Sequence, residues 1–233
     1  MFGRRLVDRI NSLPEGDFER RQRAAERNLM HMGITFNVYG DDRGQEKILP
    51  FDLVPRLVTA EEWEWIVGVN VLGVAHGVIA FGPILAEAGE GHIVNTASEA
   101  GLVTNTVLGM YCATKHAVVG LSESLWRELH PMGVGVSCLC PNLVNTRIFQ
   151  SERNRPYAAE LTATQNAIMT PMREMISARG MAPSEAARHV ADAIVEDRFW
   201  VFTHDITPAA AAVRFTDIEA RRNPTDPYGG MEL

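Results

Sequence analysis

The chain has 233 residues, of which 46% are hydrophobic and 22% charged, as expected of a soluble globular protein with one large or two small domains. Its formal net charge of -7 argues against a general affinity for nucleic acid. The N-terminus has basic residues with no apolar stretch behind them, so it does not resemble a secretory signal.

Three cysteines are present, and two of them, Cys138 and Cys140, lie in an apolar run that is typical of a strand. Side chains at i and i+2 of a strand share a face and point in parallel, so we expect free thiols. No Cys/His cluster has the spacing of a zinc site, and we predict no metal. Buried free thiols are typical of a reducing compartment, which predicts a cytoplasmic location.

The first 62 residues differ in character from the rest of the chain. They are rich in charged residues and predict a helix at 17–30. Extended segments follow at 33–40 and 47–58, and two prolines break the second one. We therefore treat residues 1–62 as a segment separate from residues 63–233.

A helix is predicted to begin in the segment TAEEWEWI and to continue through Ile84. Residues 66–85 contain no Asp, Glu, Lys or Arg, and this stretch is long enough to cross a bilayer. Asn70, His76 and several glycines interrupt it. We interpret it as a helix buried in a core or a subunit interface, with no membrane contact.

Beyond Trp63 the predicted helices and strands alternate. Strands are predicted at 91–98, 133–141 and 199–204, and helices at 111–130 and 183–196. The apolar runs of the first two strands are typical of strands buried on both faces of a parallel sheet. The alternation predicts an α/β fold with flanking helices. The segment 142–182 is mixed, and the tail at 221–230 is expected to be loose.

Polar residues mark the carboxyl ends of these strands, where ligands of such sheets bind. Ser98 ends the first strand, and Tyr111 and Lys115 open the helix after it. Residues four apart share a helix face, so the ammonium can lie near the phenol oxygen. A nearby cation lowers the pKa of a tyrosine and suits it to proton transfer. The same spacing alone also fits an amphipathic tyrosine beside a surface lysine.

Four motifs, in this order and spacing, resemble the short-chain dehydrogenase/reductases: VNVLG (69–73), IVNTAS (93–98), YCATK (111–115) and CPNLVNT (140–146). The resemblance covers about residues 63–224. It implies hydride transfer between NAD or NADP and a small-molecule carbonyl or secondary alcohol. The sequence does not distinguish NAD from NADP, and it does not name the substrate. In this family the helices at 63–85 and 111–130 often form the dimer interface, which implies a homo-oligomer.

The resemblance also implies a role for each matched residue. Tyr111 would be the catalytic acid/base, and Ser98 would orient the substrate oxygen. Lys115 would hold the nicotinamide ribose and lower the pKa of Tyr111, and Asn70 would hold a water of a proton relay. Together with Tyr111 and Lys115, the cofactor-binding set would include Pro141, Val144 and Thr146, which would line the nicotinamide side.

Asn142 departs from the family pattern, because a glycine usually follows the proline of the last motif. Asparagine is the residue other than glycine that best tolerates a positive φ, so we expect the turn to be retained.

The first 62 residues contain no glycine-rich motif of the kind that binds a dinucleotide pyrophosphate. The resemblance therefore implies a partial, N-terminally truncated Rossmann-like parallel sheet with flanking helices. Residues 21–66 instead resemble a segment of circularly permuted ATP-grasp proteins, in the phrases GITFNVYGD and PFDLVPRLV. Three functions stay open: an oxidoreductase with a Ser-Tyr-Lys mechanism, a catalytically impaired chimera or pseudoenzyme that acts as an interaction module, and a fragment of an ATP-grasp ligase.

Overall fold

The sheet is parallel, as the alternation of helices and strands predicts. The computed structural model describes residues 60–105, 108–154 and 163–229. In it, strands β1 (Gly91–Thr96), β2 (Val134–Cys140) and β3 (Trp200–Phe202) pair in that order. The register places Gly91 opposite Val134 and Cys138 opposite Trp200. Parallel pairing brings all three carboxyl ends to one edge of the sheet.

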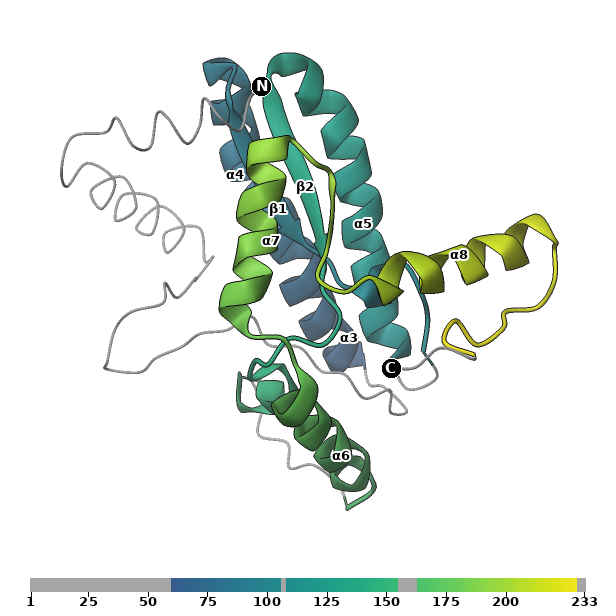
Figure 1. Cartoon of the computed structure of the whole chain (residues 1–233). Helices are drawn as coiled ribbons and strands as arrows, with labels where there is room; N and C mark the ends of the chain where they lie inside the picture. Colours follow the sequence, from purple (N-terminus) through teal and green to yellow (C-terminus); the bar gives the residue numbers. More distant parts are fainter. Residues whose placement is uncertain (1–59, 106–107, 155–162, 230–233) are drawn as a thin grey trace.

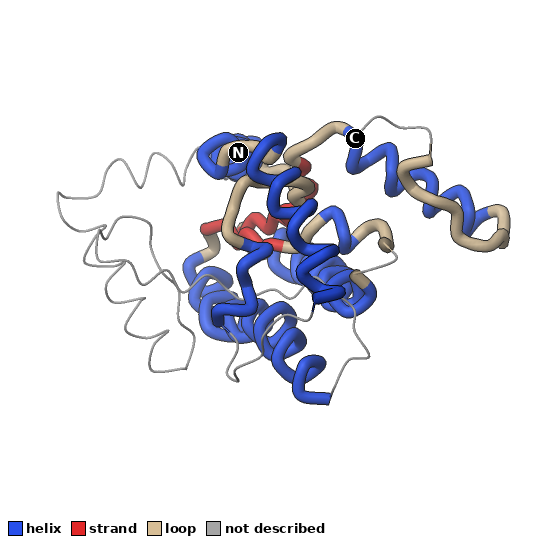
Figure 2. The backbone as a smooth tube through the Cα atoms, turned by 90° about the horizontal axis from the view of Figure 1, so that it is seen from below, coloured by secondary structure: helices blue, strands red, loops and turns tan. Residues whose placement is uncertain are grey.

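Helices cover both faces of this sheet (Figure 1). Helices α4 (Gly73–Ala88) and α5 (Gly109–Leu129) pack on one face, and α7 (Pro183–Glu196) lies over the other. Seen from below, the strands lie among the surrounding helices (Figure 2). The predicted α/β fold is confirmed for the described residues.

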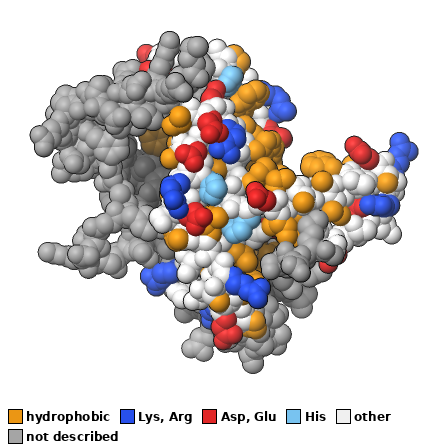
Figure 3. Space-filling view, in the orientation of Figure 1, with side chains coloured by type: hydrophobic (Ala, Val, Ile, Leu, Met, Phe, Trp, Pro, Cys, Tyr) orange, Lys and Arg blue, Asp and Glu red, His pale blue; other side chains and the backbone are white. Residues whose placement is uncertain are grey.

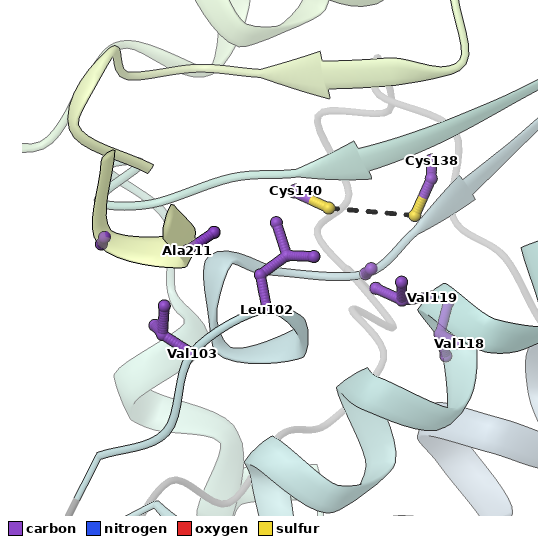
Figure 4. Packing of buried hydrophobic residues seen from close by; sticks show 9 residues of the cluster. Leu102, Val103, Val118, Val119, Cys138, Cys140 and Ala211 are labelled. Carbon is purple, nitrogen blue, oxygen red and sulfur yellow. Dashed lines mark hydrogen bonds between the residues drawn. The ribbon is translucent and has the colours of Figure 1, made fainter. Parts of the chain in front are cut away.

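The core forms where β2 meets α5. The even-numbered residues of β2, from Val134 to Cys140, are buried against α5, because side chains alternate between the two faces of a strand. Figure 4 shows Cys138 and Cys140 beside Val118 and Val119, with their two sulfur atoms 3.8 Å apart. All three cysteines are free and buried, which confirms the prediction made for them.

The first described helix is long and only partly buried. It consists of α3 (Ala60–Val67), a π-helical turn η1 (Gly68–Leu72) and α4. Among the described residues, Ala60–Ala88 is the one helix long and apolar enough to cross a membrane by length and composition, with a hydropathy of 1.8. Only 11% of its apolar window is buried, and Ile79 and Ile84 are exposed. This helix packs on α5 and β1 and is only partly buried in this chain's core, so of the two predicted settings, a core or a subunit interface, the second stays a prediction.

Two further helices lie in segments where no helix was predicted. Helix α6 (Ala163–Arg179) falls in the segment interpreted as mixed, and it contains Pro171. Helix α8 (Ile206–Glu219) projects from the body as an arm with acidic, basic and hydrophobic side chains on its surface (Figures 1 and 3). Short helical turns complete the structure: η2 (Glu99–Gly101), η3 (His130–Met132) and η4 (Ile148–Asn154).

The described part of the C-terminal tail is not loose, contrary to expectation. The carboxylate of Asp217 accepts hydrogen bonds from Arg222 and from the backbone and hydroxyl of Thr225. These contacts fold the tail back beside α8. The predictions for residues 1–59, which include the strand-like segments at 33–40 and 47–58, lie outside the described residues.

Candidate active site

Ser98 lies just beyond the carboxyl end of β1, against the neighbouring strand end. Its hydroxyl donates to the carbonyl oxygen of Pro141 over 3.4 Å and accepts from the backbone N–H of Ala100 over 3.1 Å. The next turn, η2, approaches α5 so closely that a Cβ on Gly101 would lie 2.7 Å from the carbonyl oxygen of Lys115. A glycine at this position therefore lets the Ser98 turn lie directly on the helix that carries Tyr111 and Lys115.

Tyr111 and Lys115 lie on the same buried face of α5, as their spacing predicts. Lys115 is only 2% exposed, and its ammonium donates a hydrogen bond of 2.9 Å to the carbonyl oxygen of Thr96, the last residue of β1. The Nζ atom also lies 5.7 Å from the centre of the Tyr111 ring. The surface-lysine interpretation is therefore wrong for this chain, because the lysine points into the strand end.

Burial controls the protonation of both groups. Desolvation raises the pKa of Tyr111 to about 12, and a hydrogen bond with Ser98 opposes that rise. Desolvation lowers the pKa of Lys115 to about 7, against an opposing effect of Cys138 and Cys140. Desolvation is the largest cause of the raised pKa of Tyr111, and the predicted role of Lys115 in lowering that pKa stays a prediction. A tyrosine with this pKa is protonated at neutral pH and suited to donate a proton.

Asn70 lies in the π-helical turn η1 and is 1% exposed. Its Nδ2 atom donates to the hydroxyl of Thr114 over 2.9 Å, and that hydroxyl donates to the carbonyl oxygen of Tyr111. The Oδ1 atom of Asn70 is buried with no hydrogen-bond partner among the described residues. π-Helical turns often occur at functional sites. Asn70 thus contacts the turn of α5 that carries Tyr111, and it retains a buried acceptor.

The segment after β2 carries the residues predicted for the cofactor side. Pro141 lies next to Ser98, because its carbonyl oxygen accepts from both the Ser98 hydroxyl and the Glu99 backbone. Val144 forms an isolated parallel bridge with Met181, which fixes the segment. Thr146 is exposed, and its hydroxyl accepts from the backbone of Ile148. The structure brings Pro141 to the site, whereas the roles of Val144 and Thr146 stay predictions.

Asn142 keeps the turn by a different means from the one expected. The described residues other than glycine with a positive φ are Asp197 and Arg221, so Asn142 does not use that conformation. Its backbone N–H donates to the hydroxyl of Thr203, and its side chain donates to Glu99 over 2.8 Å. The substitution of glycine by asparagine therefore adds a side-chain contact.

Glu99 is the principal site residue that sequence reasoning missed. It follows Ser98 directly and is buried, although it is charged. A charged residue between a buried strand and a small-residue turn is unusual, and that pattern could have singled it out. No group of three or more His, Cys, Asp or Glu residues that could hold a metal exists among the described residues.

The comparisons with known proteins agree with the α/β fold. The family model of the short chain dehydrogenases matches residues 54–156. A short-chain dehydrogenase/reductase from Burkholderia phymatum, solved in complex with NAD, is 42% identical, with a TM-score of 0.68 over 76% of this chain and 64% of its own. Residues 54–156 are therefore similar to the short-chain dehydrogenase/reductase family.

Curated dehydrogenases are similar over shorter stretches. A 3-alpha-(or 20-beta)-hydroxysteroid dehydrogenase from Mycobacterium tuberculosis is 38% identical over 116 residues, which are 46% of this chain and 44% of that protein. A C alpha-dehydrogenase from Sphingobium sp. is 27% identical over 148 residues, which are 63% of this chain and 48% of that protein. The chain spans about half the length of the curated relatives that it matches.

The described residues fit one part of a nicotinamide cofactor. Lys115, buried at the carboxyl edge of the parallel sheet, is the residue that would hold the ribose of such a cofactor. The buried, unpartnered Oδ1 atom of Asn70 is a further acceptor near the same helix. The pyrophosphate-binding motif that the sequence lacks would lie within residues 1–62. Of these, residues 1–59 lie outside the described residues.

Proposed function

We propose that this chain carries the proton-transfer half of an NAD- or NADP-dependent oxidoreductase that acts on a small carbonyl compound or secondary alcohol. The observation that carries the proposal is the burial of Lys115 against the end of β1, with Tyr111 one turn earlier and hydrogen-bonded to Ser98. A lysine is rarely buried without a role, because desolvation of its charge is costly.

In the proposed mechanism Tyr111 donates its phenolic proton to the substrate carbonyl oxygen, or accepts one from an alcohol. The Ser98 hydroxyl orients that oxygen, since it already bonds to Tyr111 in the structure. Lys115 holds the ribose and supplies positive charge near the phenol, and Asn70 holds a water that reaches Lys115. A bound nicotinamide, with Pro141, Val144 and Thr146 on its side, supplies or accepts the hydride.

We also propose a homo-oligomer through the helices at 63–85 and 111–130. The apolar outer face of Ala60–Ala88 is exposed, whereas its inner face packs on α5. Asn70 and Ile66 are nearly fully buried on this helix, and such one-sided burial favours a subunit interface over a bilayer. Buried free thiols and the acidic net charge favour a cytoplasmic protein without affinity for nucleic acid.

The alternative is a catalytically impaired chimera that acts as an interaction module. The observation that favours it is the sequence of residues 1–62, which lacks a glycine-rich motif and resembles a segment of ATP-grasp proteins. In that case residues 1–62 and 63–233 have different origins. The site geometry then reflects descent, and the exposed helix Ala60–Ala88 is the functional surface.

A cofactor titration separates the two functions. NADH and NADPH are titrated into the purified chain and into Lys115→Ala, with fluorescence as the readout. Arg127→Ala is the matched control, because Arg127 is an exposed cation on the same helix. The oxidoreductase proposal expects binding that weakens at least about tenfold in Lys115→Ala and stays unchanged in the control. No binding of either nucleotide at millimolar concentration would establish the impaired alternative.

A further inference from the structure

The side chain of Glu99 accepts hydrogen bonds from three parts of the chain that are distant in sequence. Its Oε2 atom accepts from Asn142 Nδ2 and from the hydroxyl of Thr207, and its Oε1 atom accepts from the hydroxyl of Tyr228. Glu99 is 6% exposed, and Thr207 is fully buried. We refer to these four residues as the Glu99 cluster.

The donors of the Glu99 cluster come from separate elements. Asn142 follows β2, Thr207 lies in the first turn of α8, and Tyr228 belongs to the C-terminal tail. Tyr228 lies 129 residues from Glu99 along the chain. A single carboxylate therefore connects the second strand end, the projecting helix and the tail.

The physical cause of this convergence is the cost of burying a charge. A carboxylate removed from water needs hydrogen-bond donors on both oxygens, and the cluster provides them as neutral groups. Burial and the bond to Glu99 raise the pKa of Tyr228, so that its hydroxyl remains a donor at neutral pH. Without the charge on Glu99, the hydrogen bonds that join the three segments would be weaker.

The cluster also connects to the reactive groups. Glu99 directly follows Ser98, and its backbone N–H donates to Pro141 over 2.9 Å, the same carbonyl oxygen that accepts from the Ser98 hydroxyl. The Asn142 amide is the next residue along the same turn. The side chain and the backbone of Glu99 therefore hold the Ser98 turn and the Pro141–Asn142 turn at a set separation.

We propose that Glu99 is a positioning residue of the candidate active site, and that its carboxylate fixes the Ser98 hydroxyl relative to Tyr111 and Pro141 by binding Asn142, Thr207 and Tyr228. This inference rests on the proposed function for its catalytic meaning. The C-terminal tail then becomes part of the site, because Tyr228 supplies one of the donors.

The test compares Glu99→Gln with the wild-type chain by two readouts that need no cofactor. The first is the ¹⁹F resonance of fluorotyrosine at position 111, assigned with Tyr111→Phe. The second is amide hydrogen exchange at Ala100 and Asn142. We expect Glu99→Gln to shift the resonance and to speed exchange at both amides about tenfold, while the Cys138 amide in the β2–β3 ladder stays protected.

Three further variants sharpen the result. Glu128→Gln removes an exposed carboxylate from the same helix as Tyr111 and should leave both readouts as in the wild type. Tyr228→Phe removes one donor, and should give a smaller change in the same direction even if Glu99→Gln fails to fold. Glu99→Gln combined with Asn142→Asp places the amide at position 99 and the carboxylate at position 142. This exchanged pair should return the Tyr111 resonance toward its wild-type position.

A purely structural role would give a different pattern. If Glu99→Gln lowers the melting temperature but leaves the Tyr111 resonance and the exchange at Ala100 and Asn142 unchanged, the proposal is overturned. In a chain that turns over NADH, a positioning role lowers kcat about tenfold or more and leaves cofactor affinity within about threefold. Failure of the wild-type chain to bind NADH would defeat the proposed function, while the two cofactor-free readouts would still decide the role of Glu99.

Discussion

The carboxyl end of the sheet and the outer face of Ala60–Ala88 are opposites in composition and burial. At the sheet end, Asn70, Ser98, Glu99 and Lys115 are polar or charged, and all are buried. On the outer face of the helix, Leu72, Ile79 and Ile84 are apolar and exposed, Ile79 to 71%. Buried polar groups cost free energy unless they are paired, and exposed apolar groups gain nothing without a partner. In most proteins polar side chains are exposed and apolar ones are buried. Both regions show the reverse, as expected of an active site and of a docking surface.

The difference shows how each region can be tested. The polar side chains at the sheet end are held by hydrogen bonds within the chain, so substitutions there should change chemistry and pH dependence. The apolar side chains on the outer helix face are exposed, so substitutions there should change association and leave the fold intact.

Removal of the Tyr111 hydroxyl should have the largest effect. We expect Tyr111→Phe to lower carbonyl reduction by about 10²–10⁴-fold, because a positioned proton donor contributes about that much. NADH affinity, measured by fluorescence titration, should stay within about threefold, since the ring remains. Turnover equal to that of the wild type would remove Tyr111 from the mechanism.

Truncation of Ile66 should have the next largest effect. Ile66 is fully buried and packs with Met110, Tyr111, Phe149 and Ile176. We expect Ile66→Ala to lower the free energy of unfolding by about 2–5 kcal/mol, through lost burial and a residual cavity. Urea denaturation followed by circular dichroism measures the change. A loss below about 0.5 kcal/mol would contradict the packing of this helix on α5.

Replacement of Lys115 by methionine should stabilise the fold at neutral pH. The pKa of Lys115 is lowered from 10.5 to about 7, so between these values the unfolded chain binds more protons than the native one. Wild-type stability therefore rises with pH across this window. We expect Lys115→Met to be more stable by roughly 1–3 kcal/mol at pH 7, after loss of the Thr96 hydrogen bond, and the gain to shrink toward pH 10.

The chain contains two lysines, Lys47 and Lys115, which permits a direct check of that prediction. With ¹³C-labelled lysine, one resonance should titrate near pH 7 and disappear in Lys115→Met. Titration of both lysines above pH 10 would show that Lys115 is not desolvated in solution.

Substitution on the exposed helix face should have the smallest effect on stability. Ile79 lies on the same continuous helix as Ile66 but is exposed, so Ile79→Ser is its matched counterpart. We expect the free energy of unfolding of the monomer to change by less than about 0.5 kcal/mol. Sedimentation velocity should show a smaller species if this face joins two copies, and an unchanged sedimentation coefficient would argue against that interface.

The local elements could be predicted because their signals lie close together in the chain. The apolar runs before Ser98 and Pro141 predicted buried parallel strands. Both strands are parallel, and β2 is buried, whereas β1 ends the described sheet and is only partly buried. The spacing of Tyr111 and Lys115 placed them on one helix face. Helix α6 was harder to predict because Pro171 interrupts its pattern. The tail was expected to be loose from its prolines and glycines, yet the carboxylate of Asp217 holds it.

The amino-acid sequence by itself determined the α/β order of elements and the similarity of residues 54–156 to the short-chain dehydrogenases, and it predicted the four residues of the candidate active site. Only the tertiary structure decided that Lys115 is buried, that Asn142 binds Glu99, and that the outer face of Ala60–Ala88 is exposed. The physical reason is how far along the chain each interaction reaches. Periodicity and spacing act within a few turns of chain, whereas burial and hydrogen-bond partners depend on segments as far apart as Glu99 and Tyr228, which only the folded chain brings together.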